Sequence, residues 1–263
     1  MRNLIYLAVS FLSSAVGAIC GIGGGVIIKP VLDFCAMDNV STISFLSSCT
    51  VLSMSCYSVG RSLVSGTSKV DMKVGTPLAV GAVIGGIAGK QLFNTVKAMA
   101  AAPNTVGAVQ AFCLAVITVG TLVYTLCKSM IKTYYVKNVG VCTGIGVVLG
   151  IMSSFLGIGG GPINLVVLVF FFSMDTKTAA QNSLYVILFS QVASLVTTLV
   201  TRSIPPFTWS SLSLMVCGGI GGGIAGRIVN KRMDNAAVDK LFIGLMVLII
   251  AISIYNTVRY TAG

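Results

Sequence analysis

Charged side chains are scarce in this chain of 263 residues, where they make up 9% of the sequence. Glutamate and histidine are absent, and the acidic residues are six aspartates. Soluble domains carry about 25% charged residues, so a chain this poor in charge cannot cover a water-facing surface. Without histidine there is no ligand to complete a Cys–His zinc site, and an elaborate proton relay is hard to build. No metal or cofactor is expected.

Apolar sequence takes the place of charge: 56% of the residues are hydrophobic, and the mean hydropathy is +0.98. Continuous apolar stretches of about 17–25 residues predict an all-α polytopic membrane protein with about eight membrane segments. Because the stretches do not alternate, a β-barrel is excluded. The apolar segments are expected at about 3–20, 26–37, 40–65, 74–95, 105–127, 138–156, 162–174, 178–201, 208–229 and 238–258.

The net charge of +11 does not indicate a nucleic-acid partner. The basic residues are spread over short loops, and no aromatic-basic motif accompanies them. Loop charge of this kind sets the orientation of a membrane protein. The N-terminus resembles a signal peptide, but its apolar run leads directly into a glycine-rich loop and further apolar segments. We therefore interpret it as a retained first segment.

Enzyme motifs are missing, and the chain is not expected to be an enzyme. The glycine-rich loops fit neither a dinucleotide fingerprint nor a P-loop, and there is no credible catalytic triad. The eight cysteines form no C-x-x-C, so they are interpreted as small buried hydrophobic residues. Cys20 is the exception to watch because it directly precedes the first glycine loop. A membrane-embedded thiol redox protein using Cys20 or Cys35 is therefore one alternative.

The most informative pattern is a duplication. Gly21–Gly25 recurs as Gly157–Gly161, 136 residues later, and Gly85–Lys90 matches Gly222–Arg227 at an offset of 137. Met37-Asp38 matches Met174-Asp175 at that same offset. One register thus covers three motifs, which predicts two homologous repeats. We expect a first transmembrane repeat at 1–127, a basic linker at 128–137 and a second transmembrane repeat at 138–263.

The two halves can be parallel or inverted. If each half crosses the membrane four times, the halves are parallel and the 17 basic residues divide almost evenly between the two sides. If each glycine loop is the tip of a re-entrant hairpin, the halves are inverted and the basic residues divide six to eleven. The positive-inside rule favours the inverted arrangement, with the N-terminus outside. The six basic residues on the outer side are then Arg2, Lys29, Lys90, Lys97, Arg202 and Arg259.

Each glycine loop is a candidate anion site. Successive glycines allow backbone N–H groups to converge on an oxyanion, and the helix that follows adds its dipole. Two such loops in a membrane predict two half-helix N-termini that face one central site. Close helix packing through small residues is the alternative. The candidate substrate-binding glycines are Gly23, Gly24, Gly25, Gly159, Gly160 and Gly161.

A second group of glycines is expected to pack helices rather than bind a ligand. These glycines recur every four residues, which is the spacing that lets two helices approach closely. They are Gly81, Gly85 and Gly89 in the first half, and Gly218, Gly222 and Gly226 in the second.

Polar residues after the loops are further candidates for the substrate site. Asn164 lies three residues beyond Gly161 in an apolar stretch, and because a buried amide needs a partner we expect it to face the cavity. Hydroxyl and amide groups suit sulfite or sulfonate oxygens, whereas helix capping and interhelical hydrogen bonding are the alternatives. The other candidates are Ser47, Ser48, Gln181, Asn182 and Ser183.

Four charged residues near the loops also require interpretation. Asp38 and Asp175 precede apolar segments and are expected to be helix N-caps. Asp33 is the one plausible carboxylate within the membrane. Lys29 either attracts the substrate or snorkels to the interface, and we favour snorkelling.

These motifs resemble the TauE/SafE sulfite exporter family, also called TSUP. The similarity is carried by Gly21–Pro30 with its second-half copy, by the later glycine-rich helix that ends in a basic residue, and by the total length. It covers essentially the whole chain. The resemblance implies a multi-pass carrier in the inner (plasma) membrane for sulfur-containing anions such as sulfite, thiosulfate or sulfoacetate. A homodimer is left open.

The expected function is therefore secondary transport of a small sulfur-containing anion by alternating access. Export is favoured because an anion leaves a cell down the inside-negative potential, which contributes about 2.3 kcal/mol per charge per 100 mV. Uptake would need a coupled ion, for which the sequence shows no clear site. A passive anion channel and a scaffold without transport remain alternatives beside the thiol redox protein.

Overall fold

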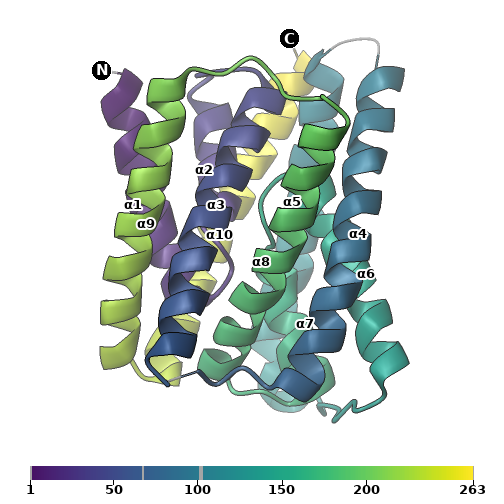
Figure 1. Cartoon of the computed structure of the whole chain (residues 1–263), viewed down its shortest axis with the longest axis vertical. Helices are drawn as coiled ribbons and strands as arrows, with labels where there is room; N and C mark the ends of the chain where they lie inside the picture. Colours follow the sequence, from purple (N-terminus) through teal and green to yellow (C-terminus); the bar gives the residue numbers. More distant parts are fainter. Residues whose placement is uncertain (1, 67, 101–102, 263) are drawn as a thin grey trace.

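The computed structural model describes residues 2–66, 68–100 and 103–262, and in these ranges the chain is all-α (Figure 1). Eight of its helices are long and apolar enough to cross a membrane, which confirms the predicted all-α polytopic architecture. The first-half helices are α1 (Arg2–Cys20), α2 (Gly25–Phe34), α3 (Val40–Val64), α4 (Met72–Met99) and α5 (Pro103–Cys127). After the 3₁₀ turn η1 (Lys128–Met130) come α6 (Val139–Leu156), α7 (Pro162–Phe172), α8 (Thr176–Val200), α9 (Trp209–Arg232) and α10 (Asn235–Ala262).

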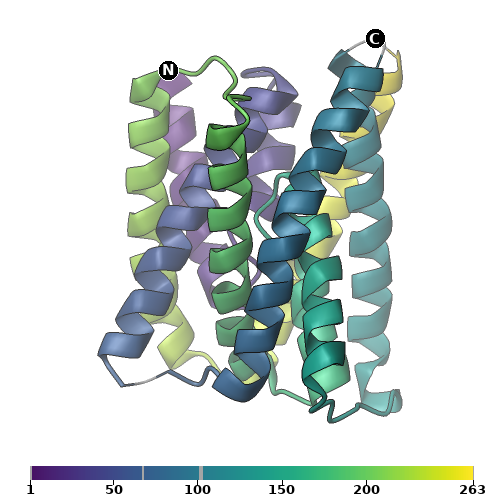
Figure 2. The ribbon, with the colours of Figure 1, turned by 45° about the vertical axis from the view of Figure 1, so that its right-hand side comes forward.

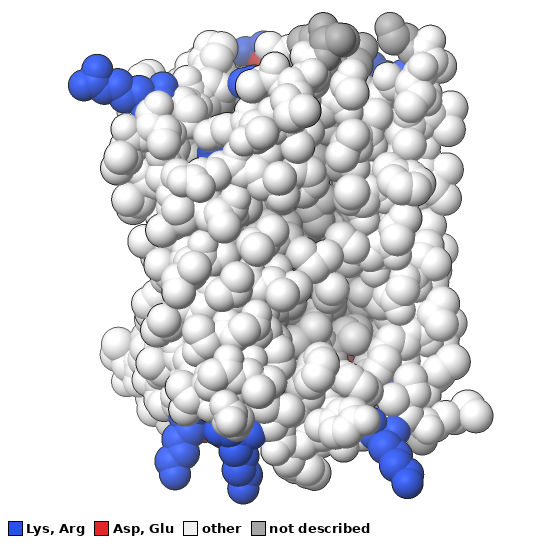
Figure 3. All heavy atoms as spheres, turned by 90° about the vertical axis from the view of Figure 1, so that its right-hand side faces the viewer, with Lys and Arg blue, Asp and Glu red and all other residues white. Residues whose placement is uncertain are grey.

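The helices lie roughly along one axis, and the two ends of the chain lie at the same end of the bundle (Figures 1 and 2). The loops that join α1 to α2 and α6 to α7 lie within the height of the bundle rather than at its ends. On the face shown in Figure 3, Lys and Arg gather at the two ends and leave a band between them that is nearly free of charged side chains. Such a band is what a hydrocarbon layer requires.

Helices from opposite halves of the chain pack in close pairs. α1 lies against α9, α4 lies against α6, and α5 lies against α10. The glycines spaced by four make the first two pairs possible. A Cβ atom on Gly85 would lie 2.9 Å from the Ile151 nitrogen of α6, and a Cβ atom on Gly222 would lie 2.9 Å from the Ala15 nitrogen of α1. The prediction that these glycines pack helices is confirmed.

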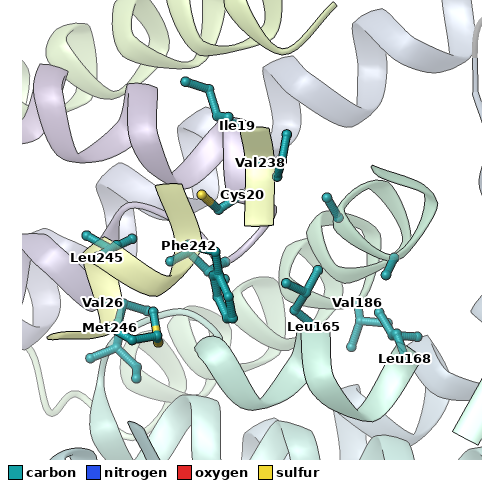
Figure 4. Packing of buried hydrophobic residues seen from close by; sticks show 14 of the residues in the cluster. Ile19, Cys20, Val26, Leu165, Leu168, Val186, Val238, Phe242, Leu245 and Met246 are labelled. Atoms are coloured by element: carbon teal, nitrogen blue, oxygen red, sulfur yellow. The ribbon is translucent and has the colours of Figure 1, made fainter. Parts of the chain in front are cut away.

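The apolar core surrounds the first glycine loop (Figure 4). Cys20 is fully buried in the same cluster as Val26 of α2 and Phe242 of α10. Its environment is that of a small hydrophobic residue, although the sequence singled it out as the exception. A thiol buried in this way has no access to a redox partner. Four of the other cysteines are exposed, contrary to the expectation that they are buried: Cys35, Cys56, Cys127 and Cys217.

The two expected aspartate caps have different outcomes. Asp175 is the N-cap of α8 and accepts a hydrogen bond from the Thr178 nitrogen, as predicted. Partial burial opposes ionisation of this carboxyl, but the bonds from Thr178 hold its pKa below the ordinary value. The prediction for Asp38 is wrong, because Asn39 is the N-cap of α3 and Asp38 instead accepts a hydrogen bond from the Tyr6 hydroxyl of α1.

The expected basic linker runs alongside the end of α7. The Tyr134 nitrogen donates to the Phe170 carbonyl at 2.8 Å, and the Val136 nitrogen donates to the Phe171 carbonyl at 3.0 Å. At its start, Lys128 forms an ion pair with Asp239 of α10. The linker is therefore a packed segment.

Replacing Gly222 by alanine should lower the melting temperature of the purified protein by several degrees. The new methyl group would meet the α1 backbone, and overpacking of this kind costs about 1–3 kcal/mol. The neighbouring Gly221→Ala is the matched control, because its Cβ would lie 3.4 Å from the Phe11 ring and alanine favours a helix. Equal melting temperatures for the two variants would contradict the packing role of Gly222.

Candidate functional site

Glycine loops interrupt two helical pairs inside the bundle. α1 ends at Cys20 and α2 begins at Gly25, while α6 ends at Leu156 and α7 begins at Pro162. The backbone of the loops takes left-handed conformations that side chains rarely adopt. φ is +72° at Gly21 and +74° at Gly23 in the first loop, and +65°, +74°, +134° and +154° at residues 157, 159, 160 and 161 in the second. This geometry explains why the sequence uses consecutive glycines here.

The two loops meet each other at the centre of the molecule. A Cβ atom on Gly25 would collide with the Ile158 carbonyl, and a Cβ atom on Gly23 would lie 3.4 Å from the Gly159 carbonyl oxygen. Residues 136 positions apart in the sequence are thus brought into contact. Glycine is needed at position 25, because a side chain there would push the two loops apart. On the other side of the contact, a Cβ atom on Gly159 would collide with Val51 of α3.

The N-termini of the two short helices have no side-chain cap within the described ranges. Gly24 is the N-cap of α2 and Gly161 is the N-cap of α7. The first turn of a helix leaves N–H groups without an intrahelical partner, and the helix dipole adds partial positive charge at the same end. The arrangement therefore presents two donor-rich, partly positive ends to one region.

By contrast, the C-terminal ends of the broken helices are satisfied by side chains from elsewhere. Asn230 of α9 donates to the Ile19 carbonyl at 2.7 Å. Lys29 donates to the Leu156 carbonyl at 2.9 Å, and Gln110 donates to the Phe155 carbonyl at 2.5 Å. These bonds satisfy three of the carbonyls at the negative ends of α1 and α6.

Lys29 corrects a sequence-based expectation. Its side chain is 3% exposed, and its ammonium group also donates to the Gln110 side chain of α5. It therefore lies inside the bundle and does not snorkel to the interface. The reason is that α6 ends within the bundle, where its last carbonyl needs a buried donor.

Buried hydroxyl and amide groups surround the meeting point of the loops. The Ser14 Oγ lies 2.8 Å, and the Ser47 Oγ 2.9 Å, from where Cβ atoms on Gly24 and Gly25 would lie. Asn164 is 2% exposed, and its Nδ2 lies 3.4 Å from the corresponding position on Gly160. In the described part of the chain, the Oγ atoms of Ser14 and Ser47 and the Oδ1 of Asn164 have no hydrogen-bond partner.

α3 and α8 bring two further serines towards the loops. Ser44 lies against Gly157, with its Oγ 2.9 Å from where a Cβ atom would lie. Ser183 lies on α8 between Ala180, which lies against Gly21, and Ile187, which lies against Gly160. Residues three or four apart share one face of a helix. The oxygens of Ser44 and Ser183 also lack partners among the described residues.

Two of the remaining predicted polar residues, Gln181 and Asn182, bond to the segment before α4. Asn182 holds the segment before α4: its Oδ1 accepts from the Asp71 nitrogen at 3.2 Å, and its Nδ2 donates to the Lys69 carbonyl at 3.2 Å. Gln181 accepts from the Lys69 nitrogen at 2.9 Å. Ser48 is buried on α3 between Ser44, which lies against Gly157, and Val51, which lies against Gly159. Ser14 was missed because it is one of several serines in the apolar run of α1, with no sequence signal that sets it apart.

A basic vestibule leads towards the first glycine loop from one end of the bundle. Its volume is about 290 Å³, and it reaches Ala18, two residues before the end of α1. No acidic residue lines it. Its polar lining consists of Lys69, Lys177, Arg227, Lys231, Gln181, Asn230, Ser58 and Ser62.

The vestibule carries a positive field into the protein. Lys177 donates to the Met233 carbonyl at 2.8 Å, and Arg227 donates to the Ser58 carbonyl at 3.3 Å. Neutral carbonyls hold these two cations in place without cancelling their charge. Clefts lined by charges of one sign concentrate ions of the opposite sign, so the vestibule can collect anions.

The chain is similar in sequence to known membrane transporters. The sequence model of the sulfite exporter TauE/SafE family matches residues 6–253. The probable membrane transporter protein YunE of Bacillus subtilis is 21% identical over 276 residues, which span 95% of this chain and 96% of that relative. No solved structure matches. With broken helices, a positive vestibule and a family match over nearly its whole length, the chain belongs to the TauE/SafE sulfite exporter family of membrane transporters.

Proposed function

We propose that this protein is a secondary transporter of sulfur-containing oxyanions or organosulfonates, such as sulfite, thiosulfate or sulfoacetate. The anion binds where the two glycine loops meet, and the two sides of the membrane gain access to it in turn. The substrate class comes from the family, and the place of binding comes from the geometry.

The observation that carries the proposal is the meeting of two uncapped helix N-termini beside hydroxyl groups that lack partners. Leaving a buried polar group unpaired costs about 1–3 kcal/mol. An oxyanion offers several acceptor atoms on one centre, which suits a set of backbone N–H and serine O–H donors. The same groups give a metal cation no carboxylate ligand.

We infer further that the two halves are inverted repeats and that the loops are the tips of re-entrant hairpins. α3 and α8 have the same length at an offset of 136 residues. The contacts of the loops are exchanged at that offset, because Gly157 lies against Ser44 and Gly21 lies against Ala180. The pairing of α4 with α6 likewise mirrors the pairing of α9 with α1.

This symmetry supports alternating access. The vestibule residues Ala18 and Ser58 correspond, at the offset of 136, to Ser154 and Ser194, which are 4% and 5% exposed. Alternating access requires the equivalent entrance at the opposite end to be closed while the vestibule is open. Phe45, which corresponds to the vestibule residue Gln181 at the same offset, packs against Phe207 of the 201–208 loop, with ring centroids 5.2 Å apart.

The orientation follows from the positive-inside rule. The cations of the vestibule are among the eleven basic residues that the inverted arrangement assigns to one side. That side is expected to be cytoplasmic, which makes this conformation inward-open in the plasma membrane. Export of the anion is then downhill in the membrane potential.

Counterflow in proteoliposomes tests the function. Labelled sulfite, thiosulfate and sulfoacetate are each offered to vesicles loaded with the same unlabelled anion. Saturable exchange of one of them is expected, because a carrier with one closed entrance must bind its substrate to cross. Flux without saturation or exchange would favour a passive channel, and no flux of any of the three would overturn the substrate class.

Replacing Ser47 or Ser183 by alanine should weaken anion binding by about tenfold to a hundredfold, because a hydrogen bond to a charged group contributes about 1.5–3 kcal/mol. Neither hydroxyl has a partner among the described residues, so the melting temperature without anion should not fall. Ser211→Ala removes another buried, unpartnered hydroxyl on α9 and is the control. Unchanged affinity in both loop variants would move the site elsewhere.

Gly160→Leu should abolish counterflow while the protein still elutes as a folded particle. The new side chain would start 2.5 Å from Ile187, at a backbone position with φ of +134°. Gly244→Leu on α10 is the matched control, since nothing lies within 4 Å of its Cβ position. Full exchange by Gly160→Leu would exclude the second loop from the binding site.

Removing two cations from the vestibule should slow capture of the anion without changing the chemistry of the site. Lys69→Gln combined with Lys231→Gln is expected to raise the KM for transport by about two- to tenfold, with little change in maximal rate. The dependence of KM on salt should weaken too. Lys132→Gln in the linker lies outside the vestibule and serves as the control; a matching rise in its KM would argue against local steering.

A further inference from the structure

A second polar cluster lies between α2, α5 and α10, apart from the basic vestibule. It surrounds a cavity of about 10 Å³, which is close to the space that one water molecule occupies. The cavity touches the second glycine loop at Ile158. Its polar lining consists of Lys29, Asp33, Gln110, Ser253 and Asn256.

Three oxygen atoms of this cluster lack a hydrogen-bond partner among the described residues. They are the Oδ1 of Asp33, the Oγ of Ser253 and the Oδ1 of Asn256, on side chains that are 6%, 0% and 1% exposed. Lys29 binds Gln110 and the Leu156 carbonyl, and the Asn256 Nδ2 binds the Pro30 carbonyl at 2.9 Å. The Tyr260 hydroxyl donates to the Asp33 carboxyl, and Oδ1 is the carboxyl oxygen that is left to bind a proton.

Asp33 differs from the other five aspartates because one of its oxygens, Oδ1, is buried without a partner among the described residues. Its carboxyl group does have one partner, the Tyr260 hydroxyl of α10. Among the other five, in the part of the chain that the structure describes, each has a recorded partner. Asp71, Asp175 and Asp234 accept bonds from backbone nitrogens of the helices they precede. Asp38 binds Tyr6, and Asp239 pairs with Lys128.

The charges that face Asp33 favour a proton over a metal cation. Lys29 lies one turn earlier on α2, and Arg259 and Tyr260 face the carboxyl from α10, where the Tyr260 hydroxyl donates to it. Lys90 of α4 adds its field at Lys29. A hard metal cation prefers about six oxygen ligands, whereas this cavity offers three unpaired oxygens beside cationic groups. A proton needs one oxygen.

Lys29 connects the carboxyl to the anion site. Its ammonium group binds the Leu156 carbonyl, which immediately precedes the second glycine loop. An ionised Asp33 offsets part of the positive potential that Lys29 produces at the second glycine loop. A neutral Asp33 does not offset it. Protonation therefore raises the positive potential where the anion is expected to bind, and by linkage the bound anion favours protonation to the same extent.

We propose that Asp33 is a proton-binding site and that the protein carries a proton together with its anion. The Asp33 Oδ1 gains an O–H bond when the anion binds and loses it when the anion leaves. This inference rests on the proposed anion site at the glycine loops. It supplies a coupling ion, which the sequence did not reveal.

Asp33→Asn tests the proposal, because the amide imitates the protonated carboxyl and cannot release a proton. The probe is labelled thiosulfate in proteoliposomes, or labelled sulfoacetate where thiosulfate does not exchange. The wild-type protein should accumulate the anion in response to an imposed pH gradient, and a pH-sensitive dye should report protons moving with it. Asp33→Asn should retain counterflow, which shows that it is folded, and should lose accumulation driven by the gradient.

Asp234→Asn, which alters an exposed cap, is the control and should behave as wild type. Gradient-driven accumulation by Asp33→Asn, or its absence in the wild type, would overturn the proposal. If the wild-type protein exchanges none of the anions, the fault lies with the proposed function. Infrared difference spectra between acidic and alkaline buffer then test the proton site independently of transport. A carboxylic acid band that is present in the wild type and absent in Asp33→Asn supports the proton site. A band that is unchanged in Asp33→Asn overturns it.

Discussion

The constraint on which this structure depends is the cost of leaving backbone hydrogen-bonding groups unpaired in an apolar interior. Two helices stop inside the bundle, and each stop frees carbonyls on one side and N–H groups on the other. The carbonyls of Ile19, Leu156 and Phe155 are matched by Asn230, Lys29 and Gln110. The first turns of α2 and α7 have no side-chain cap in the described ranges. A deficit of acceptors at the centre is what a transported anion can fill.

Several features followed from sequence because they depend on local pattern. Length and hydropathy located the long helices, and the spacing of four residues identified Gly85 and Gly222 as packing positions. The glycine loops were recognisable because a left-handed backbone at consecutive positions requires glycine. Their mutual contact was expected from the duplication, which pointed to one shared site.

Other features depended on partners distant in the chain, which no local pattern specifies. Lys29 meets residues 81 and 127 positions away, so its burial could not be read from its apolar neighbours. Asp38 follows the usual spacing of an N-cap, but Tyr6 on another helix captures it and Asn39 takes its place. Asn182 was a plausible ligand until the 68–71 segment was seen to satisfy its amide. In each case tertiary context decided between two reasonable local roles.

The exchange of helix partners between the halves has a consequence for synthesis. α1 packs against α9, which begins at Trp209, so the first helix reaches the membrane long before its partner exists. At about 5–20 residues per second, the delay is on the order of ten to forty seconds. During that time Ser10 and Ser14 of α1, buried in the finished protein, must be sheltered by lipid headgroups, the insertion machinery or a temporary neighbour. During biogenesis of this transporter, the packing of α1 is therefore completed only after the last two helices have been synthesised and inserted.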